Sequence, residues 1–149
     1  MNSIVFYVLL ALAAGCCLPT QAGINAQLNL WARSPVLTAT ISFAVGTVAL
    51  LGYALALRLP LPPLAEASGR PWWIWSGGVL GAFFVAAAVV LVPRLGATSM
   101  LALILAGQMV ASLFLDHFGL LGYPVHPVSV GRLLGVALVA GGVLLIRNS

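Results

Sequence analysis

Two rows of uncharged polar residues lie within the long apolar stretches of this sequence. In the first row, Gln21, Asn25 and Asn29 advance four residues at a time, so on a helix they share one face. Amide side chains at membrane depth need a hydrogen-bonding partner or a wet cavity. The spacing therefore predicts a face that either binds a polar solute or joins helices through hydrogen bonds.

A second row with the same spacing lies in a later apolar stretch and consists of Gln108, Ser112 and Asp116. Gln108 lies roughly 18 Å from the start of its stretch, and Gln21 lies roughly 15 Å from the end of its own. These two helix ends face the same side of the membrane, so the two residues lie at similar depths. We therefore expect Gln21, Asn25 and Gln108 to meet near the midplane, with Thr38 and Ser42 lining the same space. The alternative is that these side chains join helices, at about 0.6 to 2 kcal/mol per hydrogen bond.

Asp116 is the acidic residue that lies nearest to a predicted helix, because Glu66 falls in a loop. At the end of its helix, Asp116 is expected at the membrane surface, next to His117 or Arg132. The alternative is a coupling role, since a carboxylate inside the membrane is a candidate for proton transfer.

Composition identifies the solvent of this chain. Of its 149 residues, 62% are hydrophobic and 5% are charged, which is too little charge to cover a water-soluble domain. The six basic residues are all arginines and stand apart from one another, so they form no patch for nucleic acid. Cys16 and Cys17 have no further ligands at metal-binding spacing, and no catalytic motif is present. We predict one membrane domain over residues 1–149, with no enzymatic activity, metal or cofactor.

Five apolar stretches predict five transmembrane helices, at about 4–31, 35–57, 72–92, 97–115 and 130–146. The first is roughly 42 Å long, whereas the hydrocarbon core of a bilayer is about 30 Å thick. Pro19 removes a hydrogen bond to the preceding turn, so this long helix is expected to kink near Pro19. The predicted fold class is an all-α integral membrane protein.

The arginines are divided equally between the two sides of the predicted membrane domain. One side holds Arg58, Arg70 and Arg132, and the other holds Arg33, Arg94 and Arg147. An excess of Lys and Arg normally keeps one side of a membrane protein in the cytoplasm. The equal division predicts that copies insert in both orientations and pair as an antiparallel (inverted) homodimer, an arrangement related to the inverted repeats of secondary transporters.

Small residues recur at four-residue spacing in four of the predicted helices. In lipid this spacing lets helix backbones approach closely, because packing drives helix association there. It predicts a tightly packed bundle and a dimer held by helices. The glycines expected at these contacts are Gly46, Gly77, Gly81, Gly107, Gly131 and Gly135.

Several short blocks, in order along nearly the whole chain, resemble the YdcZ-like family of the drug/metabolite transporter superfamily. The blocks are Gln21-Ala22-Gly23-Ile24-Asn25-Ala26, Ser34-Pro35, Ser42-Phe43, Gly46-Thr47, Trp72-Trp73, Gly77-Gly78 with Gly81, Pro93-Arg94-Leu95-Gly96-Ala97, Gly107-Gln108 and Asp116-His117-Phe118-Gly119. The resemblance implies a five-helix exporter of the bacterial inner membrane that works as a dual-topology homodimer, as a pair of oppositely oriented chains or as a fused ten-helix protein.

The function predicted from these features is secondary transport of a small polar metabolite or drug-like solute by alternating access. The chain also resembles small multidrug exporters in architecture, but it lacks the glutamate that those proteins carry in their first helix. A neutral or zwitterionic solute therefore fits the amides better than a cation does. The alternatives are a passive pore and a non-transporting membrane subunit of a larger complex.

Overall fold

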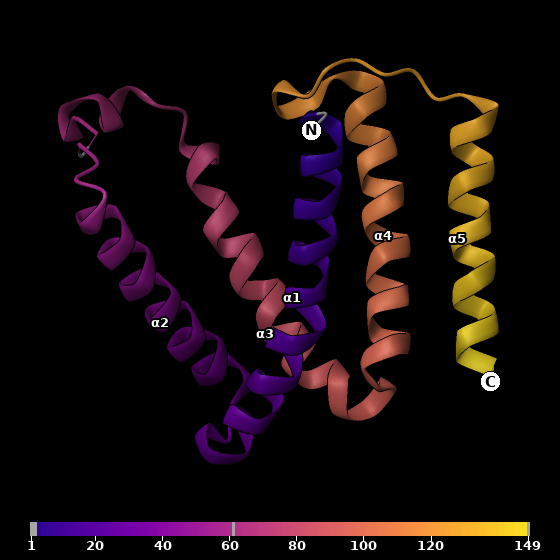
Figure 1. Cartoon of the computed structure of the whole chain (residues 1–149), viewed down its shortest axis with the longest axis horizontal. Coiled ribbons are helices and arrows are strands. Elements are labelled where there is room, and N and C mark those ends of the chain that lie inside the picture. Colours follow the sequence, from indigo (N-terminus) through magenta and orange to yellow (C-terminus); the bar gives the residue numbers. More distant parts are fainter. Residues whose placement is uncertain (1–2, 61, 149) are drawn as a thin grey trace. The chain divides into compact units, whose positions relative to one another are not determined.

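A computed structural model describes residues 3–60 and 62–148 of the chain, and the side chains of Ser3, Leu64, Ser68, Arg147 and Asn148 lie outside the described part. The described residues form α-helices joined by loops and short 3-10 turns, with no β-strand among them (Figure 1). The α-helices are α1 (Ser3–Ala32), α2 (Pro35–Ala56), α3 (Ser76–Leu95), α4 (Ala97–Phe118) and α5 (Val130–Asn148). The prediction of an all-α membrane protein with five helices is confirmed.

The chain divides into two compact units. One ends at Pro93 and contains α1, α2 and nearly all of α3, and the other begins at Arg94 and contains α4 and α5. In the first unit the C-terminal half of α1 contacts α2 near the turn that joins them and the two helices then diverge (Figure 1), and in the second unit α4 packs along α5. Each unit therefore contains one pair of adjacent antiparallel helices, and each pair has its own set of polar residues.

Helix α1 continues without interruption through Pro19. At 1.5 Å per residue, its 30 residues span roughly 45 Å, well beyond the hydrocarbon thickness. Figure 1 shows that the axis of α1 changes direction within its length, as expected for a helix that contains an internal proline.

Helix α2 has a defined beginning and a defined end. The Ser34 hydroxyl accepts a hydrogen bond from the Leu37 N–H at 3.3 Å, and Pro35 occupies the first turn, where its missing N–H costs nothing. At the other end, Arg58 adopts a left-handed conformation with φ of 51°, and the Leu59 N–H bonds to the Ala54 carbonyl. This is a Schellman arrangement in which arginine takes the place that glycine usually occupies.

Helix α3 differs from its predicted bounds at both ends. Trp72–Trp75 form a 3-10 turn, and the α-helix begins only at Ser76. At the other end, the helix continues through Pro93 to Leu95, and the chain turns at Gly96 with φ of 75°. A proline near a helix end removes one hydrogen bond, and this does not prevent the last residues from keeping helical angles.

Helix α4 is one turn longer than predicted and therefore includes Asp116. It ends at Gly119, whose φ of 59° is left-handed and whose added Cβ would lie 2.6 Å from Val125 Cγ2. Glycine is the residue that meets both requirements.

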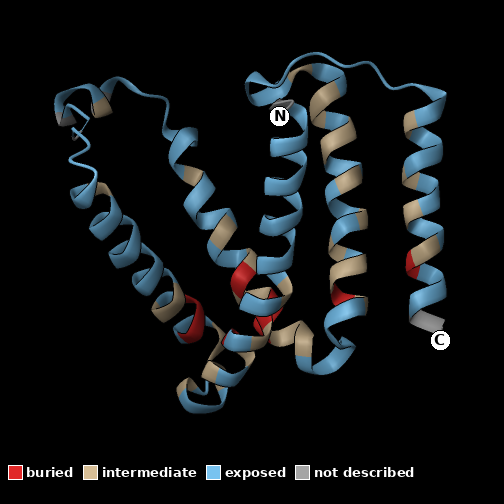
Figure 2. Ribbon diagram, in the orientation of Figure 1, coloured by how far each residue is buried: buried red, intermediate tan, exposed pale blue. Residues whose placement is uncertain are grey.

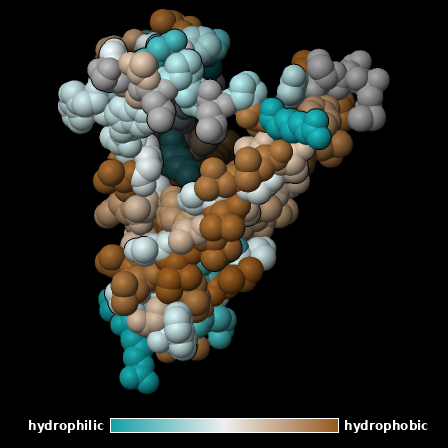
Figure 3. Space-filling model, turned by 90° about the vertical axis from the view of Figure 1, so that its left-hand side faces the viewer, coloured by the Kyte–Doolittle hydropathy of each residue, from teal (hydrophilic) through white to brown (hydrophobic). Residues whose placement is uncertain are grey.

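Four of the described helical segments are long and apolar enough to cross a membrane. They are Ile4–Ala32, Pro35–Ala56, Trp72–Leu95 and Ala97–Phe118. The apolar part of α5, Val130–Ile146, is shorter, at roughly 25 Å. Buried residues are few along the described helices (Figure 2), and large hydrophobic side chains such as Leu55, at 78%, are exposed. Figure 3 shows hydrophobic residues over much of the helical surface. So much exposed apolar surface requires lipid or another protein around it.

Candidate functional site

The polar face of α1 lies against α2. The Thr38 hydroxyl donates a hydrogen bond to Asn29 Oδ1 at 3.1 Å, and Thr38 is completely buried. This bond joins the α1–α2 pair next to its connecting turn. It satisfies the oxygen of the Asn29 amide, so Asn29 has a structural role in joining the two helices.

The Asn29–Thr38 bond fixes the register of the two helices. In an antiparallel pair, one turn further from the connection brings Asn25 level with Ser42, and a second turn brings Gln21 level with Gly46. The α2 residues that face α1 therefore recur every four residues, as the polar residues of α1 do. They are Thr38, Ser42 and Gly46. We call this line of contact the α1–α2 seam.

A small polar hollow opens beside the seam at the level of Gln21. It has a volume of about 220 Å³ and is lined by Gln21, Ser42, Phe43, Gly46, Thr47 and Leu50. The structure thus brings together Gln21 and Ser42, two of the predicted binding residues. Thr47 and Phe43 were missed as site residues because they lie outside the four-residue series. Among the described residues, none forms a hydrogen bond with the side chains of Gln21, Ser42 or Thr47.

Asn25 is the buried member of the seam whose amide is not satisfied. It is 4% exposed, and no described residue forms a hydrogen bond with its side chain. No fully enclosed side-chain nitrogen or oxygen of the described residues lacks a partner, so the Asn25 amide stays accessible from outside the chain. A solute, a water molecule or a second chain can therefore reach it.

Gln108 is an exposed residue of α4 and belongs to the second unit. Its meeting with Gln21 and Asn25 near the midplane stays a prediction. Ser112, one turn further along, donates a hydrogen bond to the Met109 carbonyl at 3.1 Å. The second predicted row thus includes a hydroxyl that is satisfied within its own helix.

Asp116 lies in the last turn of α4 and forms an ion pair with Arg132 of α5. The Arg132 guanidinium nitrogen lies 3.3 Å from Asp116 Oδ2, and the side chains of Arg132 and Asp116 are 36% and 28% exposed. The same guanidinium donates to the His126 carbonyl at 3.2 Å, and the His126 N–H donates to the Asp116 carbonyl at 2.8 Å. This network holds the α4–α5 connection against the end of α4. A coupling role for Asp116 stays a prediction.

His117 completes this connection. Its Nδ1 accepts a hydrogen bond from the Val128 N–H at 3.2 Å, and its ring lies edge-on to Phe118 with centroids 4.7 Å apart. The acceptor role assigns the remaining ring proton to Nε2 in the neutral imidazole. The polar groups of this region therefore bond mainly to one another.

The predicted packing glycines differ in their surroundings. A Cβ added at Gly81 would lie 3.2 Å from Phe43 Cζ, so this position is in contact with α2. At the other five predicted glycines, an added Cβ would meet no atom within 4 Å. These glycines are Gly46, Gly77, Gly107, Gly131 and Gly135. Their role in packing against a second chain stays a prediction.

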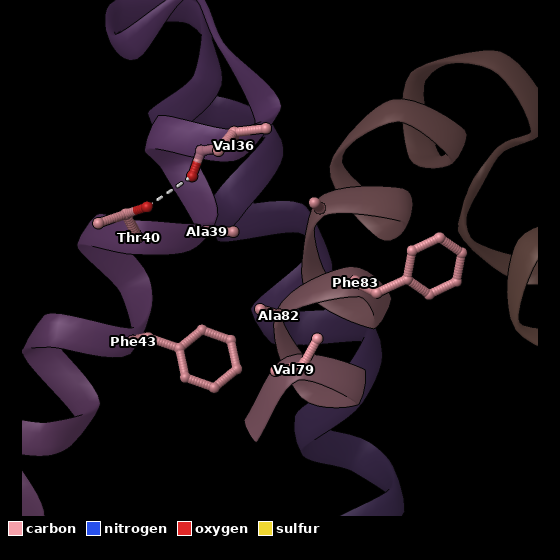
Figure 4. Close-up of a pocket in the computed structure, with 8 residues that line it drawn as sticks. Val36, Ala39, Thr40, Phe43, Val79, Ala82 and Phe83 are labelled. Atoms are coloured by element: carbon pink, nitrogen blue, oxygen red, sulfur yellow. Dashed lines mark hydrogen bonds between the residues drawn. The ribbon is translucent and has the colours of Figure 1, made fainter. Parts of the chain in front are cut away.

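A second hollow lies between α2 and α3 and has a volume of about 620 Å³ (Figure 4). It is lined by Val36, Ala39, Thr40, Phe43, Val79, Ala82, Phe83 and Ala86. Thr40 is the polar member, and its hydroxyl donates to the Val36 carbonyl at 2.9 Å. The hollow is therefore apolar in its chemistry.

Apolar helices of membrane-spanning length and a seam of uncharged polar side chains define a polytopic α-helical membrane protein. A family model described as "Putative inner membrane exporter, YdcZ" matches residues 6–145. The chain belongs to the YdcZ family, a family of membrane transporters rather than enzymes, and is a multi-pass protein of the bacterial inner membrane.

The inner membrane protein YdcZ of Escherichia coli (strain K12) is similar to this chain. The two are 30% identical over 134 residues, which cover 85% of this chain and 89% of that protein. No solved structure matches the chain. The resemblance seen in the short sequence blocks is thus confirmed at the level of the family.

Proposed function

We propose that this chain is a secondary transporter that moves a small, uncharged polar solute by alternating access. The observation that carries the proposal is Asn25, which is 4% exposed and whose amide bonds to no described residue, so that a polar solute can supply its hydrogen bonds. Gln21 and Ser42 support it from the adjacent hollow. Gln108 of α4 stays a predicted member of the binding set because of its depth along its own helix.

We further propose that the working transporter is an antiparallel homodimer. The equal division of arginines supports two insertion orientations. The open glycine positions support close contact with a second chain, because small residues let transmembrane helices approach one another. Two oppositely oriented copies would form the inverted pair on which alternating access can operate.

Transport is tested with inside-out membrane vesicles from bacteria that overproduce the chain. The vesicles are energised in a mixture of small neutral metabolites, and mass spectrometry then measures what they accumulate. We expect at least one polar compound to accumulate with the native chain and not with Asn25→Leu, while cross-linking still detects the dimer. Accumulation equal to that of vesicles without the chain would contradict the proposal, and loss of the dimer in Asn25→Leu would assign Asn25 to helix association.

Topology is tested with two C-terminal fusions, one to a reporter active in the cytoplasm and the other to a reporter active outside the inner membrane. Strong signal from both fusions is expected for a dual-topology chain. A signal from one fusion alone would contradict the antiparallel homodimer, and the chain would then need an oppositely oriented partner.

A further inference from the structure

The polar and apolar hollows share one residue, Phe43. Along α2, the apolar hollow is lined from Val36 to Phe43, and the polar hollow is lined from Ser42 to Leu50. The two hollows therefore follow each other along the same helix, with the Phe43 ring between them. Figure 4 shows this ring pointing from α2 toward α3, on the side where Val79 lies.

The volumes of the two hollows indicate how a solute would be divided between them. Small-molecule sites usually measure about 300 to 1,000 Å³. The polar hollow, at about 220 Å³, falls below this range, whereas the apolar hollow, at about 620 Å³, falls within it. A solute that binds Gln21 and Ser42 with its polar group therefore has room for the rest of its body beyond Phe43.

The chemistry of the linings agrees with this division. The polar hollow offers the side chains of Gln21, Ser42 and Thr47, which form no hydrogen bonds among the described residues. The apolar hollow offers hydrocarbon, because the Thr40 hydroxyl already bonds within its helix. Neither lining contains a charged side chain, so a charged solute would leave its charge unpaired in an apolar environment.

Gly81 determines where the Phe43 ring can lie. A Cβ at position 81 would lie 3.2 Å from Phe43 Cζ, a distance at which the ring would have to move. The described parts of α2 and α3 do not pack backbone against backbone, so this side-chain contact is important in joining them. The Phe43 ring can therefore lie between the hollows because position 81 of α3 is a glycine.

We propose that the two hollows form one site for an uncharged amphipathic solute, with Gln21, Ser42 and Thr47 around its polar head and the α2–α3 hollow around its apolar body. Phe43 contacts both parts and selects solutes by shape. This inference rests on the proposed transport function and adds the class of solute.

The probe for this site is decanamide with a diazirine at the far end of its chain. It is photolysed with the full-length protein in lipid nanodiscs, and mass spectrometry identifies the labelled residues. We expect labels on the α2 and α3 residues of the apolar hollow, and we expect excess unlabelled decanamide to suppress them about tenfold by competition. Gln21→Leu should reduce labelling about tenfold, because it removes hydrogen bonds to the amide head.

Two matched tryptophan variants test the apolar part. Val79→Trp fills the hollow and should abolish the labelling, whereas Leu80→Trp, at an exposed neighbour that does not line the hollow, should retain it. Gly81→Ala should reduce labelling by displacing the Phe43 ring.

Three results would overturn the inference. Equal labelling by a hydrocarbon diazirine without the amide head, unaffected by Gln21→Leu, would mean that lipid chains fill the hollow. Labels that instead join two copies of the chain would identify a second copy as the occupant. Labelling elsewhere only would exclude the site.

The transport assay is read separately from the labelling. Labelling as expected without accumulation in vesicles would contradict the transport proposal and support the site. Vesicle transport that Val79→Trp leaves unchanged would contradict the amphipathic site and support transport.

Discussion

The α1–α2 seam contains uncharged amides and hydroxyls, whereas the α4–α5 connection contains an ion pair and histidines, and the two regions use their polar groups differently. At the α4–α5 connection, Asp116 pairs with Arg132, and His117 accepts from the Val128 N–H. In the seam, Asn29 bonds to Thr38, but Asn25 is buried without a bond. Polar groups that satisfy one another hold structure, whereas groups left unsatisfied at membrane depth are available to a ligand. This difference is why we propose that the α4–α5 connection serves structure and that the seam binds the solute.

The largest effect is expected at Asn25. Asn25→Leu should reduce transport at least about 100-fold, because two hydrogen bonds to the solute are lost, while thermal stability should change little, because the Asn25 side chain bonds to no described residue. Vesicle uptake and the melting temperature in detergent measure the two effects. Asn29→Leu is the matched control, and it should lower stability because it breaks the bond to Thr38. Lower stability in Asn25→Leu as well would remove the distinction between the two asparagines.

Gly119→Ala is expected to give the largest loss of stability at the α4–α5 connection. The added methyl group would collide with Val125, and φ of 59° is unfavourable for alanine, so the cost should be about 1 to 3 kcal/mol. Unfolding of the purified protein in detergent measures it. Gly122→Ala is the control, because φ there is 84° but an added Cβ meets no atom within 4 Å. Equal losses in both variants would mean that backbone strain acts without the contact to Val125.

Thr38→Val separates the structural end of the seam from its binding end. The variant keeps the shape of the side chain but removes the bond to Asn29, so stability should fall by about 1 kcal/mol. Uptake by the folded protein should change less than threefold, since the Thr38 hydroxyl already bonds to Asn29 and is not free to bind a solute. Uptake as low as that of Asn25→Leu would extend the binding site to the turn between α1 and α2.

The smallest effect is expected at the ion pair of Asp116. Arg132→Gln should lower stability by about 0.2 to 1 kcal/mol, because the pair is partly exposed to solvent. Uptake at neutral pH should be unchanged if Asp116 serves structure alone. A loss of uptake in Asp116→Asn greater than that in Arg132→Gln would instead favour the coupling role.

The helices could be predicted from sequence because each is a long apolar stretch that ends at prolines, glycines or arginines. The α1 row was visible because its spacing matches one helical face. Its partner was harder to predict, because the register with α2 depends on the turn at Arg33 and Ser34, where a shift of one residue rotates the facing side chains by about 100°. Thr47 and Phe43 therefore became visible as site residues only in the structure.

The predicted proximity of Gln21 and Gln108 shows that contacts between segments far apart in the sequence are harder to predict. Depth in the membrane follows from counting residues along a helix, so Gln21 and Gln108 could be placed at similar levels. Which helices lie next to each other is decided by packing, which a residue count does not encode. The contacts within α1–α2 and within α4–α5 are the part that local sequence order determines most directly.

The left-handed arginines at the ends of α1 and α2 give the chain an unusual engineering property. Arg33, with φ of 54°, and Arg58, with φ of 51°, occupy backbone positions that glycine would adopt more easily. Arg33→Gly would remove one charge from one side of the membrane and relieve the local backbone, and Arg58→Gly would do the same for the opposite side. Under the proposed dual topology, single substitutions that favour folding would bias the direction of insertion either way, and each orientation could then be produced and studied as a separate population.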